Sequence, residues 1–144
     1  MDYTKLAGEF LSSRLKIQQQ DASKALSQLM KGELFAMNYL LEHNKMAYPK
    51  EISDYMQVST ARIATILKHL EAEGKITRQT DTKDSRYVIV KLTSQGENDI
   101  LDKRMRILKG FAKVFEYMGE ENVREFLRLN KLVLEAYKNV EIKL

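Results

Sequence analysis

The stretch HLEAEGKITRQTDTKDSRYVIVKLTSQG, residues 69 to 96, changes from a helical pattern to a strand pattern and back again. KITRQ (75–79) and RYVIVKL (86–92) both have the composition of strands, and the second alternates Val88, Val90 and Leu92 with the residues between them. The charged segment TDTKDS (80–85) separates the two. The pattern predicts a β-hairpin with a charged tip.

A well-specified helix precedes this hairpin, in QVSTARIATILKHLEAEG (57–74). Ser59 is a good N-cap and Gly74 a natural residue just after the helix end. The apolar positions recur at helical spacing and predict the buried face: Ile63, Ile66, Leu67 and Leu70. The other face has small, polar or basic residues: Ala61, Arg62, Thr65, Lys68 and His69. Such a face can approach DNA closely.

The rest of the chain is predicted to be helical. A short helix fits PKEISDYM (49–56), with Pro49 in its first turn, although Tyr48 is a poor N-cap. We expect an amphipathic helix over residues 3–17, a polar break at QQQDASK (18–24) and a helix over 29–44. A long helix should start at a capping box of Ser94 and Glu97, and the last helix should cover 120–140. The predicted fold is therefore mainly α with a small β-hairpin, in the order of a winged helix-turn-helix.

Composition limits the possible classes of protein. The chain has 144 residues, 44% of them hydrophobic, which suits one compact domain. It lacks the long apolar run of a membrane span and the layout of a signal peptide, so we expect a cytoplasmic protein. The net charge is +4, and residues 59–91 alone hold seven basic and four acidic side chains. This concentration favours a polyanionic partner, with a solvated charged face as the alternative.

The same sequence argues against an enzyme. It has no cysteine, which excludes thiolate nucleophiles, disulfides and thiol redox switches. It also lacks a glycine-rich phosphate loop, a His-Glu-x-x-His motif and a Gly-x-Ser-x-Gly motif. Asp81 and Asp84 form a carboxylate pair, but a hairpin tip is a poor place to preorganise catalysis.

Residues 69–96 resemble the MarR family of bacterial transcriptional regulators, and the resemblance extends over essentially the whole chain. Three motifs carry it in order: Leu-x-x-x-Gly-x-Ile-x-Arg from Leu70, Asp-x-Arg from Asp84, and Leu-Thr-x-x-Gly from Leu92. Lys75 departs from the family pattern, which commonly has an apolar residue after the glycine. The resemblance implies a DNA-binding transcriptional regulator, usually a repressor, with no cofactor.

The resemblance also implies which residues meet DNA. In the helix that would read the major groove they are Ser59, Thr60, Ala61, Arg62, Thr65 and Lys68. In the hairpin, Arg86 resembles the arginine that enters the minor groove, and Asp84 resembles the acid that orients it. Lys83 is a further candidate, whose charge would contact the DNA backbone. The alternative for this tip is a solvated turn with a surface ion pair of little energetic value.

A homodimer is expected for two reasons. The family is dimeric, and the terminal helices have more apolar residues than a small winged lobe could cover, among them Phe10, Ile17, Phe115, Phe126, Leu134 and Tyr137. We therefore expect one MarR-type domain over residues 1–144, with a winged lobe at 30–92 and a dimerisation region at 1–20 and 93–144. Two such lobes would bind an inverted-repeat operator.

Family members often release DNA when a small aromatic or lipophilic molecule binds. The candidate pocket residues here are Phe10, Arg14, Met37, Tyr39, Met105 and Phe111. The alternative is that these residues belong to the hydrophobic core, because methionine and aromatic residues at helical spacing more often do. The zinc-sensing branch uses several histidines, whereas this chain has only His43 and His69, so no metal site is expected. The alternative functions are a nonspecific DNA-binding protein and a winged helix that contacts only proteins.

Overall fold

The computed structural model describes residues 1–144, which form an N-terminal unit (Met1–Ile107) and a C-terminal unit (Leu108–Leu144). The elements are α1 (Tyr3–Gln18), α2 (Asp21–Leu29), α3 (Gly32–Glu42), β1 (Met46–Ala47), α4 (Pro49–Met56), α5 (Thr60–Ala72), β2 (Ile76–Thr80), β3 (Val88–Leu92), α6 (Ser94–Met118) and α7 (Glu120–Tyr137). Seven helices and a small antiparallel sheet confirm the predicted fold class. None of the helices combines the length and the apolar character that a membrane-spanning segment needs.

The core of the N-terminal unit lies where α3, α4 and α5 pack with the sheet. The apolar stripe of α5 is buried as predicted, since Ile63, Ile66, Leu67 and Leu70 are at most 3% exposed. The same core contains Leu40 of α3, Ile52 of α4, Val90 of β3 and Ile100 of α6. Burial of these side chains fixes α5 against its neighbours and leaves its polar face outward.

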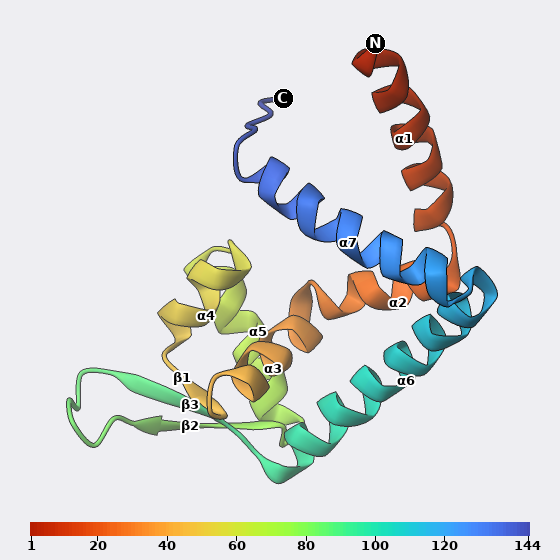
Figure 1. The fold of residues 1–144 in the computed structure, drawn as a ribbon. Helices are drawn as coiled ribbons and strands as arrows, with labels where there is room; N and C mark the ends of the chain where they lie inside the picture. Colours follow the sequence, from red (N-terminus) through yellow and green to blue (C-terminus); the bar gives the residue numbers. More distant parts are fainter. The chain divides into compact units, whose positions relative to one another are not determined.

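The sheet has three strands in the order β1-β3-β2, all antiparallel. In the hairpin, Ile76 pairs with Leu92 and Thr80 pairs with Val88. The hairpin extends away from α3, α4 and α5 (Figure 1). Val90 and Leu92 are buried, whereas Val88 lies beyond the helices and is 43% exposed. The alternating apolar pattern of β3 therefore extends to Val88, although only Val90 and Leu92 belong to the core.

Strand β1 was missing from the sequence-based prediction. It has two residues, and it pairs Met46 with Lys91 and Ala47 with Val90. Asn44 and Lys45 just before it both have positive φ, which turns the chain sharply after α3. A strand of two residues has no alternation that a pattern could reveal.

The predicted polar break after α1 was also wrong, because residues 21–29 form helix α2. The predicted helix over 29–44 begins only at Gly32, whose φ of +63° separates α2 from α3. Asp21 lies in the first turn of α2, where a negative charge favours the helix. Half-buried residues of α2 such as Leu29 pack against the core of the winged lobe. Tertiary packing thus outweighs the polar composition.

The start of α6 differs in one detail from the expected capping box. The Thr93 side-chain oxygen, not that of Ser94, accepts a hydrogen bond from the Gly96 amide at 3.0 Å. The Thr93 hydroxyl also donates to the Gly74 carbonyl at 2.7 Å. Thr93 therefore ties the start of α6 to the end of α5, which explains the Leu-Thr-x-x-Gly motif physically.

Helix α1 has no buried residue, and its apolar side chains are exposed: Leu6, Phe10, Leu11, Leu15 and Ile17. Within the C-terminal unit, α7 likewise has no buried residue. Its exposed apolar side chains include Phe126, Leu127, Leu132, Leu134 and Tyr137. Each of these helices has a large apolar surface that its own unit leaves uncovered.

Candidate nucleic-acid interface

The predicted DNA-facing residues belong to helix α5 and to its N-cap. Ser59 caps the helix by accepting a hydrogen bond from the Arg62 amide at 3.0 Å. The Thr65 hydroxyl donates to the Ala61 carbonyl at 3.2 Å, and the residue stays exposed. All six residues predicted to face DNA are exposed: Ser59, Thr60, Ala61, Arg62, Thr65 and Lys68.

The turn between α4 and α5 sets the angle of α5. Gln57 ends α4 in the left-handed conformation, with φ 55° and ψ 44°. The Val58 amide then donates to the Ser53 carbonyl at 3.1 Å, and Val58 packs against the core. This short turn with a buried anchor is the geometry of a helix-turn-helix, whose second helix fits a major groove.

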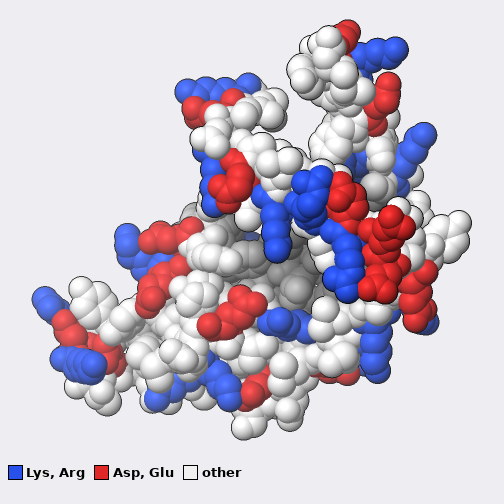
Figure 2. Space-filling model, viewed as in Figure 1, with Lys and Arg blue, Asp and Glu red and all other residues white.

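The hairpin tip brings Asp84 and Arg86 together, as the sequence predicted. The Arg86 guanidinium donates to both carboxylate oxygens of Asp84, with Nη2 to Oδ2 at 2.7 Å and Nε to Oδ1 at 3.0 Å. Arg86 remains 81% exposed, and Lys83 is exposed beside it. Basic and acidic groups lie side by side at the tip of the hairpin (Figure 2). Asp84 thus holds Arg86 in one orientation without burying it.

The pairing of Asp84 with Arg86 shifts the pKa of both side chains. The hydrogen bond from Arg86 lowers the pKa of Asp84, and the Asp84 carboxylate in turn raises the pKa of Arg86. Both groups are therefore fully charged at neutral pH. A permanent planar cation held in place suits the negative potential of a narrow minor groove.

The sequence-based prediction missed a contact that anchors the start of the loop at the hairpin tip. Tyr48, just before α4, donates its hydroxyl hydrogen bond to the carboxylate of Asp81. Asp81 is only 7% exposed, and its other oxygen accepts from the Lys83 amide at 3.0 Å. Tyr48 also lies near Tyr87, with ring centroids 5.9 Å apart. The one available signal was the tyrosine at a capping position where Ser, Thr or Asp is usual.

Replacing Tyr48 by phenylalanine should loosen the hairpin without unfolding the lobe. The Asp81 carboxylate then loses one of its two protein donors, so the Lys83 amide should exchange with solvent about 2- to 10-fold faster, the effect of one lost hydrogen bond. Hydrogen exchange measured by NMR tests this. Tyr55→Phe is the matched control, because Tyr55 is 57% exposed. Unchanged exchange at Lys83 in Tyr48→Phe would contradict the anchoring role.

The stabilisation by the hydrogen bond between Tyr48 and Asp81 depends on pH. The hydrogen bond from Tyr48 lowers the pKa of Asp81 below its usual 3.8. A carboxylate with a lowered pKa stabilises the folded state above its unfolded pKa, and this contribution is lost as the pH falls through the lower folded value. The start of the tip loop should therefore stay anchored at neutral pH and loosen only in strong acid.

Lys75, the departure from the family pattern, has its own partners. Its ammonium lies 2.9 Å from Glu73 Oε2 and 3.2 Å from Asp99 Oδ2. These carboxylates raise the pKa of Lys75, the Glu73 hydrogen bond most of all. A lysine is therefore accommodated just before β2, because it pairs with Glu73 at the end of α5 and with Asp99 of α6.

The candidate pocket residues have different surroundings. Met37 and Tyr39 are buried in the core, at 1% and 8% exposure, and Tyr39 stacks on His43. Phe10, Arg14 and Met105 are exposed, and Phe111 belongs to the C-terminal unit, where it packs near Phe115. Neither of two surface hollows, one along the hairpin and one along α5, is lined by any of the six.

The sequence profile of the SarA/Rot transcriptional regulators matches residues 18–103, which is more than half of the chain. The chain belongs to this family. The matched segment contains the whole helix-turn-helix, the hairpin and the start of α6. The predicted relationship to MarR-type winged-helix regulators is thereby confirmed, and so is the expectation that the protein is not an enzyme.

Solved structures support the same fold for this SarA/Rot family member. A MarR family protein from Bacillus stearothermophilus has 22% sequence identity and a TM-score of 0.74, covering 95% of this chain and 99% of the other. YusO from Bacillus subtilis has 19% identity and a TM-score of 0.73, covering 94% and 99%. A variant of MepR from S. aureus, solved bound to an oligodeoxyribonucleotide, has 20% identity and a TM-score of 0.57, covering 95% and 98%. The comparison with curated proteins gave no match.

Proposed function

We propose that this SarA/Rot family regulator binds DNA sequence-specifically, as a homodimer, and represses transcription. The observation that carries the proposal is the exposed polar face of α5 on the same lobe as an arginine held by Asp84 at the hairpin tip. Helix α5 would read base edges in the major groove, and Arg86 would enter the adjacent minor groove. The MepR variant bound to an oligodeoxyribonucleotide supports this role by likeness of fold.

The dimer is proposed from the uncovered apolar helices. The winged lobe would span residues 30–92, and the dimerisation region would comprise 1–20 and 93–144. Helices α1 and α7 have no buried residue, and burying their apolar side chains against a second copy would remove that surface from water. Two chains of charge +4 would also strengthen attraction to DNA.

Two finer parts of the proposal rest on the resemblance to MarR regulators. One is repression rather than activation. The other is release of DNA by a small aromatic or lipophilic molecule, for which the exposed Phe10 and Met105 offer apolar surface. Action on chromosomal DNA would place the protein in the cytoplasm.

Base reading and backbone contact can be separated by two substitutions. Thr65→Ala should change which operator bases are preferred, because a side chain in the major groove discriminates by about 1 to 3 kcal/mol per good base contact. Lys83→Ala should weaken binding to all sequences alike and reduce the slope of log affinity against log salt by about 1 per site.

Fluorescence anisotropy with an operator, single-base variants of it and a salt series measures both effects. A uniform loss across sequences for Thr65→Ala would mean that Thr65 contacts only the backbone. If neither variant nor wild type discriminated between sequences, the protein would be a nonspecific DNA binder or a protein-contact module instead.

A further inference from the structure

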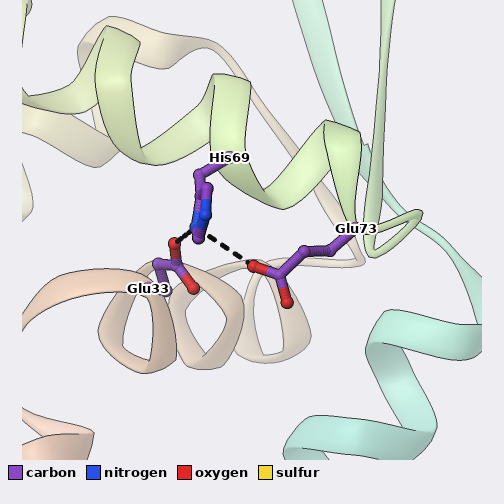
Figure 3. Close-up of side chains that lie close together, drawn as sticks. All are labelled: Glu33, His69 and Glu73. Atoms are coloured by element: carbon purple, nitrogen blue, oxygen red, sulfur yellow. Dashed lines mark hydrogen bonds and ion pairs between the residues drawn. The ribbon is translucent and has the colours of Figure 1, made fainter.

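Three side chains that the DNA-binding proposal does not use lie together between α3 and α5: Glu33, His69 and Glu73 (Figure 3). Glu33 is in the first turn of α3, and the other two are four residues apart at the end of α5. His69 Nδ1 contacts Glu33 Oε1 and lies 3.1 Å from Glu73 Oε1. Both carboxylates therefore converge on one ring nitrogen.

The spacing of these atoms suits a metal ion. The three possible ligand atoms all lie within 4.8 Å of one another. Zinc binds imidazole nitrogen and carboxylate oxygen at about 2.0 to 2.2 Å, so ligands of a tetrahedral site are roughly 3.3 Å apart. Small side-chain rotations would bring the set to that geometry, because both glutamates are partly exposed and can adjust.

The surroundings complete such a site. Lys75 holds the second oxygen of Glu73, Oε2, at 2.9 Å, which leaves Oε1 directed at His69. Lys75 is itself fixed by Asp99. Outer partners of this kind orient metal ligands. A hollow of about 440 Å³ beside Glu33 and His69 leaves room for a water molecule as a further ligand.

We propose that Glu33, His69 and Glu73 bind a divalent transition-metal ion such as Zn²⁺, which bridges α3 and α5. This proposal departs from the sequence-based expectation of no metal, which rested on the shortage of histidines. Without the ion, the hydrogen bond to Glu33 raises the pKa of the His69 imidazole.

Zinc titration of the purified full-length chain, free of any affinity tag and first treated with a chelator, tests the proposal. A chromophoric zinc chelator at neutral pH reports the competition. Wild type should take up one Zn²⁺ per chain. His69→Gln should weaken binding by at least about 100-fold, and Glu33→Gln and Glu73→Gln by at least about 10-fold each, because losing a ligand costs no less than losing an outer partner.

The matched control is His43→Gln, which alters the other histidine of the chain and should bind Zn²⁺ as wild type does. NMR of the histidine rings gives a second readout, in which zinc should shift the Nδ1 resonance of His69 and leave that of His43 unchanged. Circular dichroism checks that each variant is folded. Absence of stoichiometric uptake by wild type, or equal affinity in folded His69→Gln, would overturn the site. No DNA is used, so the result is independent of the proposed function.

Discussion

Arg86→Ala is expected to weaken operator binding about 5- to 150-fold for each hairpin that enters a groove. In a homodimer both hairpins lose the contact, so the combined effect can approach the product of two such factors. The reason is that Asp84 already holds the guanidinium in place, with hydrogen bonds of 2.7 and 3.0 Å, so little ordering is needed on binding. Titration of a labelled operator at fixed salt measures the loss.

Two further variants show whether the affinity for DNA depends on the held orientation of Arg86 or only on a positive charge. Arg86→Lys keeps the charge but loses the paired hydrogen bonds to Asp84, so it should recover only part of the affinity. Arg106→Ala removes an equally exposed arginine on α6, paired with Asp102, and should bind nearly as wild type does. Wild-type affinity in a folded Arg86→Ala protein would contradict the role given to the hairpin.

Gly96→Ala should destabilise the fold by roughly 2 to 4 kcal/mol, a large effect for one added methyl group. A Cβ at Gly96 would lie 2.1 Å from the Lys75 carbonyl oxygen and 2.8 Å from Leu92 Cδ1. The Lys75 carbonyl cannot move away easily, because it accepts a hydrogen bond from the Thr93 amide at 3.0 Å. Denaturant unfolding followed by circular dichroism measures the change in free energy.

Gly110→Ala is the control for Gly96→Ala. Both glycines lie in α6, but a Cβ at Gly110 would meet nothing within 4 Å. Alanine there should leave stability unchanged or raise it by up to about 1 kcal/mol, because alanine favours a helix interior. Equal stability of the two variants would contradict the close packing of α6 on the loop after α5.

The sequence predicted those parts of the fold that repeat a local pattern. Helix α5 and the hairpin were found because apolar positions recur at fixed spacing and because Ser59 and Gly74 mark the ends of the helix. Helix α2 was missed because its polar residues resemble a linker, and β1 because two residues make no pattern. Whether the DNA-facing residues perform their roles stays a prediction.

Contacts between distant residues could not be predicted from one sequence. Tyr48 and Asp81 are 33 positions apart, and Glu33 and His69 are 36 apart. Each pair meets only because the core places α3, α4 and α5 against one another and against the sheet. The pairing of Asp84 with Arg86, two positions apart, was expected from the resemblance to the MarR family.

The most direct test of the regulator proposal is selection of genomic DNA fragments by the purified protein at about 0.15 M salt, where the Debye length is near 8 Å. We expect a few sites that share an inverted repeat, with half-sites about one helical turn apart, as two α5 helices in a dimer require. Fragments with no shared sequence would contradict the base-reading roles of Arg62, Thr65 and Arg86.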